Sequence, residues 1–395
     1  MKRTKPFLAA WAAALAFAIL PPLLWAQVAG TALAAGRGAL APAAGAPAAA
    51  GQPPSGQAQL ITEPEDGRGA LLDAINGARK SIDITIYELD DPQLLDALIG
   101  AHGRGVRVRV LYNYYSFQWP NSGDHSSLFK AMDKLQAAGV ETRRAGKAFM
   151  ITHQKTMTMD GAASLIMDFN MRASYFSTAR GFGYLTRDPA LVSEIAKVFN
   201  ADWDYVAVSP SAPQLVWSPD NSRAKITGLI DRARVSLDIY NQEAKDKETV
   251  KAIADAARHG VKVRMLTAAL TLAESSQFHG DVIYTAGMIN AASGDIEAGS
   301  LQAGGGLSGA SGADANQAGR DMINAAGGEA KAGTGYYIHA KVYVADGGAA
   351  SAQAFLGSEN CSASSLDKNR ELGVLISDPA LISSLKRTFE KDWSR

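Results

Sequence analysis

The chain contains His153-Gln-Lys155-Thr-Met-Thr-Met-Asp160-Gly161 and His339-Ala-Lys341-Val-Tyr-Val-Ala-Asp346-Gly347, two stretches with the shared pattern H-x-K-x-x-x-x-D-G. Both have strand-like neighbours and end on Asp-Gly, a strong hairpin signal. Side chains two apart in a strand point the same way, so each stretch should present an imidazole beside an ammonium. Asp160 and Asp346 stand at an odd spacing from their histidines. We therefore interpret them as structural anchors at the turn.

The rest of the chain repeats around these stretches. Ser81-Ile-Asp83-Ile84 matches Ser236-Leu-Asp238-Ile239 at an offset of 155, which also carries Glu88 onto Glu243. The motif histidines differ by 186, and Asn170 and Asn360 by 190. Matching segments whose offset increases after each insertion are typical of two related units. The sequence predicts an N-terminal lobe over 59–208 and a C-terminal lobe over 209–395.

Strands and helices alternate within each predicted lobe. Residues 82–87 and 106–112 are strand-like, 92–102 is helix-like, and 189–203 and 379–393 have the apolar spacing of amphipathic helices. This alternation favours an α/β fold with helices covering a sheet. We expect two homologous α-β-α lobes that share one central cleft, since each lobe offers only half of a site.

The paired motifs resemble those of the phospholipase D superfamily of phosphodiesterases. The resemblance covers roughly 59–395 and continues in the second lobe with Gly357-Ser358-x-Asn360 and Glu371. The first lobe keeps Asn170 but has Met167-Asp168 in place of Gly-Ser and Gly181 in place of the Glu. The resemblance implies a two-lobed α-β-α fold and places both motifs at one cleft.

A phosphodiester is already anionic, so a site must neutralise its charge, supply a nucleophile and protonate the leaving oxygen. Lys155 and Lys341 can supply positive charge. Hydrogen bonds to the non-bridging oxygens are expected from Asn170, Asn360 and Ser358. One histidine must be neutral to attack phosphorus and the other protonated to donate.

The resemblance makes His153 the nucleophile and His339 the acid. We expect Glu371 to orient His339 and favour its charged form. The matching position for His153 is Gly181, and Asp168 can stand in for the absent carboxylate there. If it does not, the first half of the site is weakened.

The first 34 residues have the features of a secretory signal peptide. Lys2, Arg3 and Lys5 form a basic start, an apolar run extends from Phe7 to Trp25, and small residues follow. The alternative is an uncleaved membrane anchor. Residues 35–58 are an Ala/Pro/Gly linker that cannot form a core. We expect a periplasmic or secreted protein.

Charge and composition limit the partners. The 395 residues carry 39 basic and 39 acidic side chains, and loss of 1–34 would leave 36 against 39. A non-specific nucleic-acid binder usually has an excess of Lys and Arg. The single cysteine, Cys361, permits no intrachain disulfide, and no His or acid cluster has metal-ligand spacing. We expect no metal, no cofactor, and a monomer, because both motifs are in one chain.

Two segments are candidates for the rim of the cleft. Residues 286–335 are rich in Gly, Ala, Ser, Asp and Asn, which predicts a flexible loop, either disordered or a lid. Residues 112–119 contain five aromatic side chains, which lie either in the core or on a rim that touches substrate.

The leading hypothesis is an exported phospholipase D-like enzyme that hydrolyses or transfers the phosphatidyl group of phospholipids at a membrane surface, through a phosphohistidine. The alternatives are a non-specific nuclease of the same superfamily and a catalytically weak binding protein. Near-neutral charge favours lipid over nucleic acid, and intact His-Lys pairs in both lobes argue against the third function.

Overall fold

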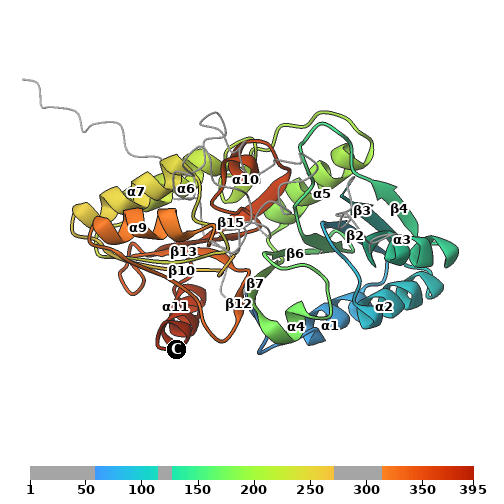
Figure 1. Ribbon diagram of the computed structural model, residues 1–395. Coiled ribbons are helices and arrows are strands. Elements are labelled where there is room, and N and C mark those ends of the chain that lie inside the picture. Colours follow the sequence, from blue (N-terminus) through green and yellow to red (C-terminus); the bar gives the residue numbers. More distant parts are fainter. Residues whose placement is uncertain (1–57, 114–126, 271–313) are drawn as a thin grey trace, which may run out of the picture. The chain divides into compact units, whose positions relative to one another are not determined.

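The fold alternates strands and helices twice along the chain (Figure 1). The computed structural model describes residues 58–113, 127–270 and 314–395. The predicted signal peptide and nearly all of the linker lie outside the described residues, as does most of the aromatic segment 112–119. Within the described residues, no helix is both long and apolar enough to cross a membrane.

The first half of the fold contains seven strands and five helices of the described chain. They are β1 (Ala58–Glu63), α1 (Gly69–Gly77), β2 (Ser81–Ile86), α2 (Pro92–Gly103), β3 (Arg107–Tyr112), α3 (Ser127–Ala137), β4 (Glu141–Arg144), β5 (Thr156–Met159), β6 (Ala163–Met167), α4 (Tyr175–Thr178), β7 (Ala179–Thr186) and α5 (Pro189–Trp203).

The second half follows the same order with additional elements. They are β8 (Leu215–Ser218), α6 (Ser222–Arg232), β9 (Ser236–Asn241), α7 (Lys247–Arg258), β10 (Lys262–Thr267), α9 (Gln317–Ala325), β11 (Glu329–Ala332), β12 (Tyr337–Ile338), β13 (Lys341–Ala345), β14 (Gln353–Gly357), α10 (Ala363–Asp367), β15 (Glu371–Ile376) and α11 (Pro379–Trp393).

Helix starts explain why the terminal helices were predicted correctly. Asp188 and Asp378 each cap a helix by accepting hydrogen bonds from two backbone amides, and a proline occupies the first turn. An Asp at the N-cap followed by Pro is a strong start signal. The Asp side chain accepts hydrogen bonds from amides of the first turn that have no partner within the helix, and proline has no amide hydrogen that needs a partner. Both helices end at tryptophan, Trp203 and Trp393.

Each half builds its own mixed sheet. The strand order is β1-β7-β6-β5-β2-β3-β4 in one and β11-β10-β9-β13-β14-β15-β8 in the other. β2–β3–β4 and β9–β10–β11 are parallel, whereas the motif strands β5 and β13 run antiparallel to β2 and β9. The predicted α/β class with two α-β-α lobes is confirmed.

Helices cover both faces of these sheets (Figure 1). In the second half, α6, α7 and α9 lie on one side and α11 packs on β9 and β13 from the other. One buried apolar cluster draws on both halves, joining Phe182 and Leu191 to Trp217, Tyr240 and Ile338. β12 also leaves its own half and pairs with β7. The halves therefore share a core.

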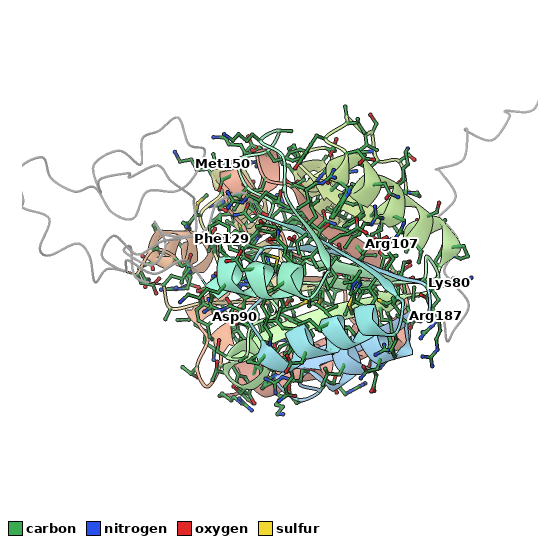
Figure 2. All side chains as sticks on the ribbon, turned by 90° about the vertical axis from the view of Figure 1, so that its right-hand side faces the viewer. Lys80, Asp90, Arg107, Phe129, Met150 and Arg187 are labelled. Atoms are coloured by element: carbon green, nitrogen blue, oxygen red, sulfur yellow. The ribbon has the colours of Figure 1, made fainter. Side chains whose placement is uncertain are left out.

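Strands β2 and β3 of the first half run in the same direction. Figure 2 looks onto the first-half helices and shows Lys80, Arg107 and Arg187 at one side and Asp90 and Met150 at the other. β2 begins next to Lys80 and β3 begins at Arg107, so their carboxyl ends lie toward the side of Asp90 and Met150. Met150 donates its amide to the Lys368 carbonyl of the second half.

The prediction that 286–335 is one flexible loop is wrong for residues 317–332, which form a helix and a strand. Helix α9 packs on α7, and β11 pairs with β10 in the sheet. Ile323 is fully buried, and a side chain at Gly319 would collide with the Ala244 carbonyl. The helix was missed because only one of its three buried residues, Ile323, is a large apolar residue; the other two are Gly319 and Arg320. Residues 286–313 lie outside the described part.

Candidate active site

The two motifs meet at one site, although 186 residues separate their histidines. His153, Lys155, His339 and Lys341 are all buried, with exposures between 0% and 5%. Glu371 of the second half contacts the His153 ring at 2.6 Å, and Asp168 of the first half accepts the Lys341 amide at 3.3 Å. Each motif is therefore in contact with the opposite half. Strands β5 and β13 begin after the histidine in each motif.

The Asp-Gly turns hold the motif strands in place. Asp160 accepts backbone hydrogen bonds from Arg79, Lys80 and Ser81 at 2.7–3.1 Å. Asp346 accepts the same set from Arg234, Val235 and Ser236, also at 2.7–3.1 Å. Both aspartates adopt the left-handed conformation, with φ of 56° and 52°. They lie at the turn end of the motif strands and anchor each strand to the start of β2 or β9.

Glu371 contacts His153 and not His339. Its Oε2 lies 2.6 Å from Nδ1 of His153, and its Oε1 accepts hydrogen bonds from Ser365 at 2.5 Å and Asn369 at 3.0 Å. The prediction that Glu371 orients the histidine of its own lobe is therefore wrong. The reason is tertiary: the β15 strand faces the first motif across the junction, where Arg370 pairs with Thr152.

Electrostatics keep both rings neutral in this arrangement. Burial lowers the pKa of His153 to about 4, although Glu371 acts in the opposite direction. Burial raises the pKa of Glu371, but His153, the charge of Lys155 and the hydrogen bond from Ser365 lower it overall, so this carboxyl group is ionised. The Nδ1–H of His153 then donates to the carboxylate and leaves Nε2 with its lone pair.

His339 has different neighbours. Nζ of Lys341 lies 3.3 Å from each of its ring nitrogens, and the Asp168 main chain forms a hydrogen bond with the ring. Burial and the charges of both lysines lower the pKa of His339 well below its usual value. No carboxylate among the described residues is hydrogen-bonded to its ring.

The lysines are held by their own motifs. Nζ of Lys155 donates to the His153 carbonyl and Nζ of Lys341 to the His339 carbonyl, each at 2.5 Å. Burial lowers the pKa of Lys341 to about 8, so it is mainly charged at neutral pH. The pKa of Lys155 falls well below its usual value, mainly through burial and then through the charge of Lys341. An anion placed between them would reverse part of both shifts.

The remaining predicted residues are close to the motifs and buried. Nδ2 of Asn170 donates to Glu88 at 3.2 Å, while the Oγ of Ser358 accepts from the Leu372 amide at 3.2 Å. Asn360 is 6% exposed, and its backbone amide donates to the Oγ of Ser365 at 2.7 Å. Their binding of phosphate stays a prediction.

Sequence reasoning missed several neighbours of the motifs. Tyr87 packs edge-on against His153 at 4.8 Å and lies 5.3 Å from Nζ of Lys155. Gln242, at the matching place in the second half, accepts from Nζ of Lys341 at 3.1 Å. Tyr175 meets His339 edge-on at 4.7 Å. The offset of 155 that pairs Glu88 with Glu243 also pairs Tyr87 with Gln242 and could have revealed both.

Solved structures of other proteins have a similar fold. Phosphatidylserine synthase from Haemophilus influenzae Rd KW20 superimposes with a TM-score of 0.59, covering 86% of this chain and 85% of that one at 13% identity. Polyphosphate kinase from Porphyromonas gingivalis gives the same TM-score, 0.59, over 84% of this chain and 50% of that one, also at 13% identity. Fold and paired motifs together define the phospholipase D class.

The family follows from the sequence match. The model of the family described as "Cardiolipin synthase, PLD-like domain" matches residues 71–203 and 226–393, and the chain belongs to this family. Mitochondrial cardiolipin hydrolase of Chlamydomonas reinhardtii is 25% identical over 134 residues, which are 34% of this chain and 56% of that protein. The protein of the same name from Xenopus laevis is 27% identical over 134 residues, 34% and 60% of the two chains. The chain thus spans little more than half the length of these relatives.

Proposed function

We propose that this protein is an exported phosphodiesterase that hydrolyses or transfers the phosphatidyl group of phospholipids. One observation carries the proposal: the His-Lys pairs of both motifs are buried at one site, where Glu371 of one half holds His153 of the other at 2.6 Å. A single phosphate can then be reached by two imidazoles and two ammonium groups.

His153 is the nucleophile in this proposal. Its Nε2 attacks phosphorus, the N–P bond forms, and the bond from phosphorus to the headgroup oxygen breaks. The ring acquires positive charge as the N–P bond forms, and the ionised Glu371 at Nδ1 stabilises that charge. This reason differs from the sequence-based one, in which Glu371 served the acid.

In this proposal His339 first donates a proton to the leaving oxygen and later accepts one from the water or alcohol that attacks. The charges of Lys155 and Lys341 help to lower its pKa, and an anionic phosphodiester between the lysines would offset them and let the ring hold a proton. A ring of low proton affinity is then a strong acid toward the leaving oxygen. After the headgroup departs, neutral His339 takes a proton from water or an alcohol, whose oxygen displaces His153 from phosphorus.

The family and the charge support phospholipid as the substrate. The family description names cardiolipin synthase, two relatives are called cardiolipin hydrolases, and the full-length structural neighbour is a phosphatidylserine synthase. Nucleic-acid binding usually needs surplus positive charge, and the formal net charge of this chain is +0. Export rests on the signal-like start of the sequence.

The test is an activity panel with purified protein on phosphatidylcholine, phosphatidylglycerol and single-stranded DNA. We expect phospholipid cleavage that survives excess EDTA, since the proposed steps use only side chains of the protein. His153→Ala and His339→Ala should each reduce turnover by about 10³-fold or more. His259→Ala, on the exposed C-cap of α7, is the control and should leave the rate unchanged.

Mass spectrometry of protein quenched during turnover should find the phosphatidyl group on His153. The same group on His339 would reverse the two roles. Cleavage of DNA without cleavage of lipid would make the protein a nuclease, and binding without turnover would make it a binding protein. Retention of half the rate in either alanine variant would contradict a shared site.

A further inference from the structure

The two halves place their carboxylates at different positions, and strand pairing shows how. In the second half, Glu371 on β15 pairs across the sheet with Ser218 on β8. In the first half, the matching pair is Gly181 on β7 and Glu63 on β1. The second half therefore has a glutamate on β15 and a serine opposite it, whereas the first half has a glycine on β7 and a glutamate opposite it.

Asp168 shows a second exchange of the same kind. It matches Ser358 at the offset of 190. Its Oδ1 accepts the Phe182 amide at 2.8 Å, just as Ser358 accepts the Leu372 amide at 3.2 Å. A Cβ atom at Gly181 would lie 2.8 Å from this Oδ1. Asp168 therefore fills the space that a side chain at position 181 would need.

Asp168 is directed at the second motif. Its Oδ2 accepts the Lys341 amide at 3.3 Å, and its main chain contacts the His339 ring. Lys341 is the charge that most lowers the pKa of Asp168, although burial raises it overall to about 7. Glu371 serves His153 in the same crossed manner. Each motif is thus positioned by a carboxylate from the other half.

Glu63 is a second buried carboxyl group close to Asp168. Cross-strand partners point to the same face of a sheet, so the side chain of Glu63 lies on the face where Asp168 meets Gly181. Glu63 is 0% exposed, and no side chain among the described residues is hydrogen-bonded to its carboxyl group. It also precedes the first residue of the family match, which begins at 71.

The charges around Glu63 are mostly negative. Asp66 and Glu65 lie on the following turn, and Asp168 lies after β6; all three raise its pKa. Arg180 on β7 donates to the Glu63 main-chain carbonyl, but its guanidinium also pairs with Glu65 and Asp392. Burial is the largest cause, and the pKa of Glu63 rises to about 8, with the Gly67 amide acting against it.

We propose that Asp168 and Glu63 act as one buried carboxyl pair that replaces the carboxylate missing at position 181, and that this pair positions His339 and Lys341. Two nearby buried carboxyl groups resist double ionisation. Asp168 then carries the charge against Lys341 while Glu63 keeps a proton. The second half has a similar arrangement, since Glu359 is fully buried near Glu371.

The first arm of the test needs no enzymatic activity. In the unfolded chain the Glu63 carboxyl group is ionised throughout pH 6–9. In the folded chain it stays protonated up to about pH 8. Wild-type stability should therefore fall as pH rises through this window. Glu63→Gln removes that loss, so its melting temperature relative to wild type should rise by about 5 °C or more from pH 6 to 9.

Controls separate the pair from a general charge effect. Glu390→Gln on α11 removes a carboxylate whose pKa is lowered by its hydrogen bond with Arg264, so its effect on melting should be constant from pH 6 to 9. In an Asp168→Asn background, the Glu63-dependent loss should end at lower pH and be smaller, because the Asp168 charge helps to raise the folded-state pKa of Glu63. A constant temperature difference for Glu63→Gln, or no effect of Asp168→Asn on it, would overturn the pair.

The second arm rests on the proposed function. Asp168→Asn should slow cleavage of an alkyl phosphodiester by about 10²-fold, because His339 is misplaced. A p-nitrophenol leaving group needs little protonation, so its release should slow much less. Equal losses on both substrates would overturn the positioning of His339. Absence of turnover in wild type would refute the proposed function, and the melting arm would still decide the pair.

Discussion

The two catalytic histidines have different chemical environments. Glu371 touches the ring of His153 at 2.6 Å, whereas Asp168 offers His339 only its main chain. A ring held by a carboxylate can stabilise positive charge, and a ring beside an ammonium group gives up its proton readily. The proposed division of labour follows from this difference.

Glu371→Gln tests the division at residue scale. Glu371 raises the pKa of His153, so the amide should lower it further and shift the acid limb of the pH–rate profile to lower pH. Loss of the charge should also reduce the rate by about 10²–10⁴-fold, as for other carboxylates that orient a catalytic imidazole. Steady-state rates from pH 4 to 9 provide the measurement. A loss confined to the alkaline limb would make His153 the acid.

The motif strands are the elements on which the site depends. Each is fixed at its far end by an aspartate that gathers three backbone amides, and at its near end by the lysine that donates to the preceding histidine carbonyl. This explains why the conspicuous Asp of the pattern stands away from the chemistry. It fixes the end of the motif strand to the start of β2 or β9, and therefore where His and Lys lie.

Asp160→Asn should weaken the first turn. The pKa of Asp160 is lowered in the folded protein, mainly by the amides of Ser81, Lys80 and Arg79, so its contribution is present above pH 4 and is lost as pH falls through the folded value. We expect a loss of about 1–3 kcal/mol at pH 7, measured by denaturant unfolding. Asp346→Asn is the matched variant and should behave alike. A loss that persists undiminished at pH 2 would contradict the ionic explanation.

The whole molecule is held together by buried ion pairs across the junction of the halves. Arg180 of β7 pairs with Asp392 of α11 at 2.6 Å, and Arg370 before β15 pairs with Asp202 of α5 at 2.8 Å. His339 also donates its amide to the Arg180 carbonyl. These contacts join the second motif to the first sheet, so folding of the halves and assembly of the site are coupled.

Arg180→Met should expose this coupling. Arg180 is 0% exposed, and its loss would leave Asp392 buried without its guanidinium partner, at an expected cost of about 3–5 kcal/mol. Thermal unfolding should remain a single transition at lower temperature. Lys391→Met removes an exposed partner of Glu65 and should change stability by less than about 1 kcal/mol. Two separate transitions in Arg180→Met would show that the halves fold independently.

The sequence by itself determined the elements and the four central residues. Alternation and Asp-Pro caps give the strands and terminal helices, because these signals are local, and the repeated H-x-K pattern identifies His153, Lys155, His339 and Lys341. Helix α9 was missed because Ile323 is the only large apolar residue among its three buried ones. Only the tertiary structure decided that Glu371 serves His153 and that Glu63 lies close to Asp168. An offset between repeats relates residues within the same half, whereas these carboxylates act on the opposite motif, and that depends on how the two sheets pack.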